Sequence, residues 1–145
     1  MQKYLSGFIM IMVASMFITT AVVAAPNMQE GKWEIKGEMK MEGMPFPMPA
    51  IPVNFSQCIT KKDMVPQKQE KNQECTKVSE KIEGNTVTWV TKCKDKKGAV
   101  TESTGSVTYQ GNSFDGKVHM VTTDPKGAKS ESNLKMAGKR TGDCK

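Results

Sequence analysis

A stretch rich in methionine and proline carries the side chains best suited to bind a soft metal or an apolar molecule. Residues 39–52 read MKMEGMPFPMPAIP and hold four of the chain's 12 methionines and four of its 7 prolines. Neighbouring thioether sulfurs select Cu(I), but methionines also fill cores and adaptable binding surfaces. Two hypotheses follow for Met44 and Met48: they bind Cu(I) or Ag(I), or they pack as a lid over the core.

Four cysteines are the second group of residues with chemical potential: Cys58, Cys75, Cys93 and Cys144. No C-x-x-C motif is present, so neither a thioredoxin-type redox site nor a haem attachment site is supported. Their wide spacing and the presence of one histidine argue against zinc. An even number of cysteines in an oxidising compartment predicts two disulfides, for which three pairings are possible.

His119 is the only histidine, and its alternation with Val118 and Met120 places it on a polar strand face. A general base needs an orienting partner and a nearby nucleophile, and no motif in the chain supplies them. We therefore expect a protein that is not an enzyme and that has no cofactor apart from Cu(I) under the metal hypothesis.

The N-terminus predicts export. Lys3 is the only charged residue before an apolar run over residues 5–23, which ends in the small residues VVAAP. This is the pattern of a secretory signal peptide cleaved after Ala24 or Ala25. Ala24 is favoured, because cleavage after Ala25 would place Pro26 directly after the cut. An uncleaved anchor is the alternative, because the run is long enough to cross a bilayer. We expect a signal peptide over residues 1–24 and one periplasmic or secreted domain over residues 25–145.

The charge balance of the chain is basic, with 21 lysines and arginines against 15 acids and a net charge of +6. All but Arg140 of these bases are lysines, which are hydrated point charges rather than bidentate ligands. A nucleic-acid partner is not expected, because no basic motif with interleaved aromatic residues is present. The net charge predicts at most a weak attraction to anionic membrane surfaces.

Two strands are expected to flank the methionine-rich loop. From Gly31 to Glu42 the odd-numbered residues are apolar or glycine, whereas the even-numbered ones are lysine or glutamate; this alternation predicts a half-buried strand. Prolines lack an N–H donor, so residues 43–50 cannot continue the ladder. A second strand is predicted over residues 51–58, and Thr60 to Asp63 resembles a capping box that opens a short helix.

The remainder of the chain reads as a meander joined by tight turns. Turns are predicted where two Gly-Asn pairs and two Asp-x-x-Gly patterns occur, at residues 84–85, 95–98, 111–112 and 124–127. The resulting register keeps one apolar face through five strands. In this register Trp89 lies opposite Gly105, and Tyr109 lies opposite Phe114.

The same alternation assigns faces to the cysteines. With Val78 on the apolar face, Cys75 falls on the polar face together with Cys58. Cys93 and Cys144 fall on the apolar face if the alternation of the last strand continues to the C-terminus. We therefore predict the disulfides Cys58–Cys75 and Cys93–Cys144.

These elements predict an all-β fold: an antiparallel up-and-down meander of about seven strands with one short helix and two disulfides. One apolar face must be covered, so the sheet is expected to curl into a barrel or half-barrel, with a sandwich as the alternative.

The order of features resembles the domain of unknown function 3617, a family of small exported bacterial proteins. The resemblance rests on GKWEI, MEGMPFPMP, QCIT, GNTVTWVTKC and GKRTGDC, and it includes all four cysteines. It implies a β-rich fold and a periplasmic or secreted location, and it implies no catalytic or binding residue.

Three functional hypotheses follow from the residues. The first is binding of a small apolar or amphipathic ligand on the concave apolar face. The candidate residues for this site are aromatic: Trp33, Phe46, Trp89, Tyr109 and Phe114. Inner-face glycines either leave space for the ligand or only ease sheet curvature; they are Gly37, Gly105 and Gly116. The second is soft-metal binding, and the third is docking of the apolar loop onto an envelope protein.

Overall fold

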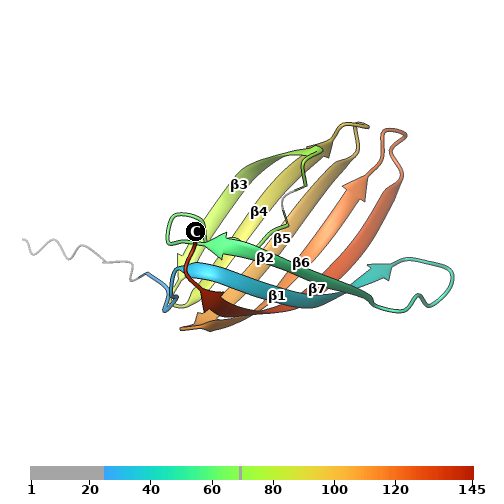
Figure 1. Cartoon of the computed structure of the whole chain (residues 1–145). Helices are drawn as coiled ribbons and strands as arrows, with labels where there is room; N and C mark the ends of the chain where they lie inside the picture. The colour runs from blue at the N-terminus through green and yellow to red at the C-terminus, as the bar shows by residue number, and fades with distance from the viewer. Residues whose placement is uncertain (1–24, 69) are drawn as a thin grey trace, which may run out of the picture.

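The computed structural model describes residues 25–68 and 70–145, so the predicted signal peptide lies outside the described residues. The described chain forms one antiparallel sheet of seven strands and no helix (Figure 1). The strands are β1 (Gly31–Glu42), β2 (Ile51–Ile59), β3 (Gln73–Glu83), β4 (Thr86–Asp95), β5 (Val100–Gln110), β6 (Ser113–Thr123) and β7 (Lys129–Gly142). A search of the described residues for a helix able to span a membrane found none.

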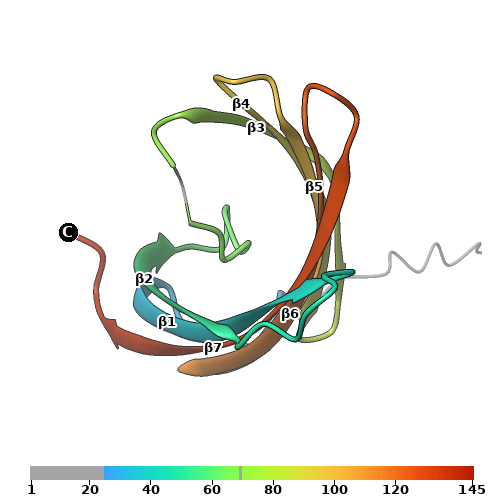
Figure 2. The ribbon, with the colours of Figure 1, turned by 90° about the vertical axis from the view of Figure 1, so that its right-hand side faces the viewer.

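The sheet curls into an open C rather than a closed barrel (Figure 2). The strand order is β2-β1-β7-β6-β5-β4-β3, so β1 pairs with β7 while β2 and β3 form the two free edges. The up-and-down order is therefore kept around the curl, but the opening lies between β2 and β3. The closed-barrel alternative is wrong, because the two edge strands do not pair.

The long connection between β2 and β3 explains where the sheet opens. In this segment Met64, Val65 and Pro66 are buried inside the curl, so the connection fills the interior instead of forming a tight turn. The predicted short helix is absent. Thr60 and Asp63 instead close a turn through reciprocal backbone hydrogen bonds of 3.1 and 3.0 Å. Met64 and Val65, which follow this turn, are buried in the core, so the segment does not form a helix.

The predicted turns and their register are confirmed from β4 to β7. Trp89 lies opposite Gly105, and Tyr109 lies opposite Phe114. Gly98, in the turn after β4, has a φ of +91°, which a residue with a side chain adopts only with strain. These turns therefore place the apolar residues of successive strands on one face.

The predicted disulfide pairing is wrong, and a β-bulge in β3 gives the first reason. The bonds are Cys58–Cys144 and Cys75–Cys93. The register of β3 on β4 shifts at Val78, which has no partner on β4 and is 60% exposed. An unpaired residue reverses the alternation beyond it, so Cys75 lies directly opposite Cys93.

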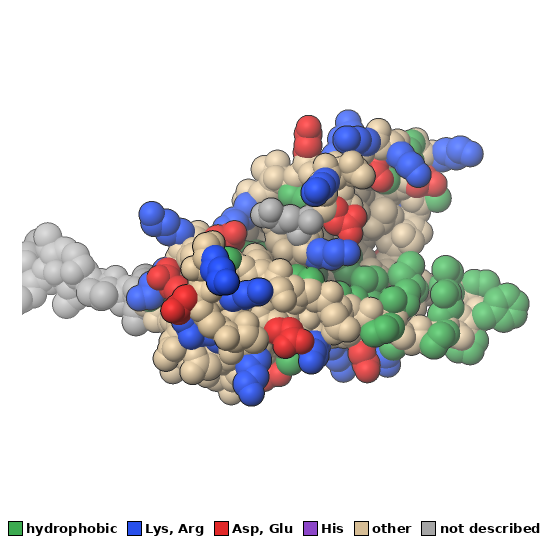
Figure 3. Space-filling model, viewed as in Figure 1, with side chains coloured by type: hydrophobic (Ala, Val, Ile, Leu, Met, Phe, Trp, Pro, Cys, Tyr) green, Lys and Arg blue, Asp and Glu red, His purple; other side chains and the backbone are tan. Residues whose placement is uncertain are grey.

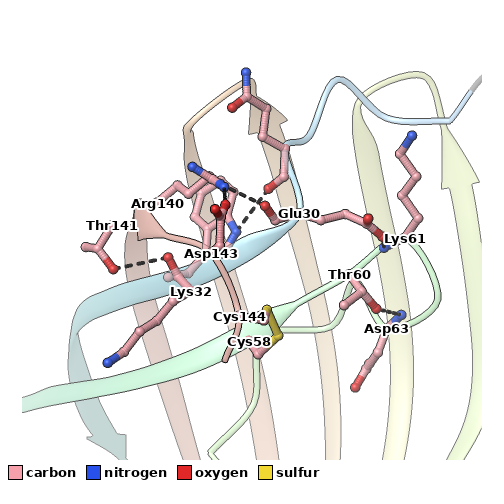
Figure 4. The surroundings of a disulfide bond; sticks show 12 residues. Glu30, Lys32, Cys58, Thr60, Lys61, Asp63, Arg140, Thr141, Asp143 and Cys144 are labelled. Atoms are coloured by element: carbon pink, nitrogen blue, oxygen red, sulfur yellow. Dashed lines mark hydrogen bonds and ion pairs between the residues drawn. A yellow bond between two sulfur atoms is a disulfide. The ribbon is translucent and has the colours of Figure 1, made fainter.

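A second irregularity, near the end of β7, gives the other half of the explanation. Trp33 pairs with Arg140 but Lys32 pairs with Gly142, so Thr141 is skipped. Its side-chain hydroxyl donates to the Lys32 carbonyl oxygen at 3.1 Å (Figure 4). Because Lys32 also pairs with Cys58, the skip brings the C-terminal segment onto the same face as Cys58, where Cys144 bonds to it.

Candidate functional site

The concave, inner face of the sheet is buried at one end and accessible at the other. Along β1, Trp33 and Ile35 are buried, whereas Met39 and Met41 on the same face are only half-buried. Along β2, Ile59 is buried, yet Ile51 is 43% exposed. We call the end around Trp33 and Ile59 the closed end and the end around Met41 and Ile51 the open end.

The closed end is filled by three mutually packed aromatic rings and the β2–β3 connection. The ring centroid of Trp33 lies 5.8 Å from that of Tyr109 and 5.5 Å from that of Phe114. Met64 and Val65 of the connection belong to the same buried cluster. The connection therefore occupies the space that a ligand would need beside these rings.

Two side chains hold the connection in place. The Tyr109 hydroxyl donates a 2.6 Å hydrogen bond to the Met64 carbonyl oxygen. The amide of Gln57 donates to the Val65 carbonyl oxygen at 3.2 Å and accepts from the Gln67 backbone N–H at 3.0 Å. Burial raises the pKa of Tyr109, and the negative charges of Asp63 and Glu80 raise it further, so the neutral hydroxyl is favoured as a donor.

Residues next to β1 and at the end of β7 also stabilise the closed end. The Arg140 guanidinium donates to the Glu30 carbonyl oxygen at 2.8 Å and pairs with Asp143, beside the Cys58–Cys144 disulfide (Figure 4). The disulfide ties the C-terminal segment to β2 across β1. No comparable cross-link is described at the tip of the β1–β2 hairpin, where residues 43–50 carry exposed or half-buried side chains.

Two inner-face glycines accommodate aromatic rings, whereas Gly37 and Gly116 lie against Met136 and neighbouring backbone. A Cβ atom added to Gly105 would overlap the Trp89 ring, and one added to Gly138 would overlap the Phe114 ring. These contacts leave no room for a ligand at the two positions. The rings instead fill the places that side chains of the opposite strand would take.

The five aromatic residues predicted to contact a ligand separate into two groups. Trp33, Trp89, Tyr109 and Phe114 are at most 3% exposed and belong to the core. Phe46 is 77% exposed on the loop between β1 and β2. The structure therefore brings Trp33, Tyr109 and Phe114 together at the closed end. Trp89 is buried against Gly105 farther along the sheet.

Apolar side chains on the inner face remain partly accessible towards the open end. They come from four strands, and they are Met39, Met41, Val53, Phe55, Met120 and Leu134. Phe55, Met120 and Leu134 pack against the buried cluster and so extend it towards the open end. We call this partly accessible apolar part of the inner face the recess. The space-filling view shows hydrophobic side chains over the projecting β1–β2 loop and the adjoining part of the sheet (Figure 3).

Polar groups border the apolar part of the open end. Thr101 and Thr122 lie opposite each other on β5 and β6, with their hydroxyl oxygens 2.9 Å apart. At the free edge of β3, Lys77 and Glu80 form an ion pair. Lys77 pairs with the buried Thr91, so this edge of the inner face carries charge.

Met44 and Met48, the predicted soft-metal ligands, both lie on the exposed β1–β2 loop, where they are 49% and 51% exposed. Both sulfur-bearing side chains therefore lie near the solvent rather than in the core. Binding of Cu(I) by this pair stays a prediction from the sequence.

His119 lies on the outer face, as predicted, in a depression of about 570 Å³. Its Nδ1–H donates to the Asn133 side-chain oxygen at 3.0 Å, and the Asn133 amide donates to Glu42. Nε2 lies 3.9 Å from a Glu131 carboxylate oxygen. This network links β1, β6 and β7 by polar contacts on the face opposite the apolar recess.

Residues 28–144 match the family described as "Protein of unknown function (DUF3617)". The chain belongs to this family. The match confirms the resemblance and includes both disulfides, the β1–β2 loop and the whole sheet. Searches of the curated proteins and of the solved structures each found no match.

In this DUF3617 protein, the candidate ligand-binding residues predicted from the sequence did not include the inner-face residues that β2, β6 and β7 contribute near the open end. Val53, Met120 and Leu134 lie at positions that alternate correctly for the inner face, so the alternation could have identified them. The buried segment around Val65 gave a weaker indication, because its apolar run is short and lies within a polar connection.

Proposed function

We propose that this DUF3617 protein is an exported, non-enzymatic protein that binds an apolar or amphipathic ligand on the open end of its inner face. One observation carries the proposal: burial on the inner face decreases along the strands, and apolar side chains are left accessible at the open end. A side chain such as Leu134 is half-buried there, although the closed end of the same face is fully covered. Binding sites for small molecules are typically concave and mostly apolar, with a few polar groups.

The polar border of the recess favours an amphipathic ligand over a purely apolar one. An acyl or ring system would contact Met39, Met120 and Leu134, where apolar burial is incomplete. A polar group on the ligand would meet the hydroxyls of Thr101 and Thr122 or the charged edge at Lys77. The two disulfides are compatible with function in an oxidising compartment.

The proposal can be tested by titrating the protein with 11-(dansylamino)undecanoic acid, whose fluorescence rises in an apolar environment. Wild-type protein is expected to bind the monomeric probe at one site. The double variant Met120→Gln, Leu134→Gln is expected to weaken binding roughly tenfold or more, since each buried apolar side chain contributes about 1.5–3 kcal/mol.

Val121→Gln is the matched control, because Val121 neighbours Met120 on β6 but faces outwards and is also half-buried. It is expected to change the dissociation constant less than about twofold, since it lies outside the proposed site. An absence of probe binding by the wild type, or equal binding by all three proteins, would contradict the proposed function.

A further inference from the structure

Three connections meet at the open end of the sheet: the β1–β2 loop (residues 43–50), the β4–β5 turn (residues 96–99) and the β6–β7 turn (residues 124–128). The register requires this, since β1 ends opposite the start of β7 and β6 ends opposite the start of β5. The loop projects beyond the two turns, and the C-terminus lies at the opposite end (Figure 1). The open end is therefore free to contact a large partner.

The β1–β2 loop is an exposed apolar tip without a charged residue. Phe46 is 77% exposed, with Met44 and Met48 at 49% and 51% on either side. In the space-filling view these side chains belong to a hydrophobic surface that covers the projecting loop (Figure 3). Large apolar side chains grouped in this way on a surface indicate an interaction site.

The backbone of the tip is suited to lipid. Pro45, Pro47 and Pro49 have no N–H group. A backbone donor without a partner is costly in a hydrocarbon environment, so removing three of them lowers the cost of entering a bilayer. A protein partner would gain fewer hydrogen bonds from such a loop than from an ordinary one.

The two neighbouring turns present lysines. Lys96 and Lys97 follow β4, and Lys126 and Lys129 lie at the β6–β7 turn; all four are exposed. Within the described residues, none of them forms an ion pair. Their positive charges are therefore available to an anionic partner.

The aspartates of these turns do not neutralise the lysines by direct pairing. The Asp95 carboxylate accepts the backbone N–H groups of Lys97 and Ala99 at 2.8 and 2.9 Å. Asp124 accepts the corresponding groups of its own turn at 2.8 Å. In each turn one carboxylate oxygen therefore accepts two backbone N–H groups, and the lysine side chains remain exposed.

We propose that the open end docks on an anionic lipid bilayer, with the apolar tip in the interface and the turn lysines against the lipid phosphates. Apolar side chains inserted below the headgroups and lysines above them are the combination that binds anionic membranes. The docking residues differ from the residues of the inner-face recess, so docking stands whether or not the recess holds a ligand.

Co-sedimentation with vesicles tests the docking. The protein is purified from the extracytoplasmic fraction, and its intact mass must show that residues 1–24 are absent, so that their apolar run cannot contribute. Vesicles of phosphatidylcholine alone are compared with vesicles that contain 30% phosphatidylglycerol. Wild-type protein is expected to bind the anionic vesicles at least tenfold more strongly, and added salt is expected to weaken binding.

Two variants separate the contributions of charge and tip. Replacing Lys96, Lys97, Lys126 and Lys129 with glutamine is expected to lower the partition coefficient on the anionic vesicles at least tenfold, towards its value on phosphatidylcholine alone. Phe46→Ser is expected to lower it about tenfold. Both variants are expected to retain binding of the dansyl probe in the absence of vesicles.

A matched control keeps the same charge change at the closed end, with glutamine at Lys61, Lys62, Lys139 and Lys145. This control is expected to bind anionic vesicles within about threefold of the wild type, because its lysines lie far from the tip. Equal losses in the two lysine variants, an unchanged Phe46→Ser variant, or no vesicle binding would each overturn the docking proposal.

Discussion

The Tyr109 hydroxyl connects the sheet to the segment that fills its closed end. It donates to the Met64 carbonyl oxygen at 2.6 Å and is completely buried. The bond satisfies a carbonyl group that would otherwise be buried without a partner. Together with Gln57, this phenolic oxygen holds the β2–β3 connection in place at the closed end.

The first prediction concerns this hydroxyl. Tyr109→Phe keeps the ring but leaves the Met64 carbonyl oxygen without its donor, which is expected to cost about 1–3 kcal/mol of unfolding free energy. Urea denaturation at pH 7 measures the loss. A change below about 0.5 kcal/mol would show that the bond does not hold the connection.

The same pair of proteins makes a pH prediction. The pKa of Tyr109 is raised in the folded state, whereas an unfolded tyrosine loses its proton near pH 10. Stability from the neutral hydroxyl is therefore fully present below about pH 10 and falls as the pH rises above it. Wild type is expected to lose stability more steeply than Tyr109→Phe in this range, and parallel curves would contradict the assignment.

A second prediction compares two glycines of β7. A Cβ on Gly138 would overlap the Phe114 ring, whereas one on Gly142 would meet nothing within 4 Å. Gly138→Ala is expected to cost about 1–3 kcal/mol, because the core must shift to relieve the overlap. Gly142→Ala is expected to stay within about 0.5 kcal/mol. Thermal unfolding distinguishes them, and equal losses would contradict the packing.

At the scale of elements, tight turns could be predicted but bulges could not. Gly98 needs a backbone conformation that few other residues adopt, so the sequence marks its turn. Val78 and Thr141 are ordinary strand residues, and nothing in their type indicates that their partners skip them. Each bulge reverses the alternation beyond it, which is why the faces predicted for Cys75 and Cys144 are wrong.

Much of the fold but less of the candidate site could be predicted. Trp33 and Trp89 belong to the apolar face as expected, yet a pattern of faces does not show which end of that face is covered. Coverage depends on Val65, which is brought to the aromatic rings only by the tertiary fold. A site defined by what remains uncovered therefore requires the structure.

The third prediction concerns the two disulfides. Cys58–Cys144 links residues 86 apart, whereas Cys75–Cys93 links residues 18 apart. In the chain-entropy account these loops correspond to about 4.5 and about 3 kcal/mol of stabilisation. Replacing the first pair by serine is therefore expected to destabilise the protein more than replacing the second. The reverse order, or peptide mapping that gives Cys58–Cys75, would contradict this assignment.

The molecule as a whole has a stabilised end and an accessible end. The Cys58–Cys144 disulfide, the aromatic cluster and the β2–β3 connection contribute to the closed end. The Cys75–Cys93 disulfide joins β3 to β4 towards the open end. The open end has incomplete apolar burial, a rim of lysines and a projecting loop (Figure 3). We propose that this accessible end is where the protein binds its ligand and contacts a lipid surface.

Methyl NMR of methionine tests the central claim most directly, because methionines occur at both ends of the inner face. Protein labelled with ¹³C at the methionine methyl groups is titrated with the dansyl fatty acid. We predict that the resonances of Met39, Met41 and Met120 shift or broaden, while those of Met28 and Met64, buried at the closed end, do not. Shifts confined to Met28 and Met64, or no shifts at all, would contradict ligand binding at the open end.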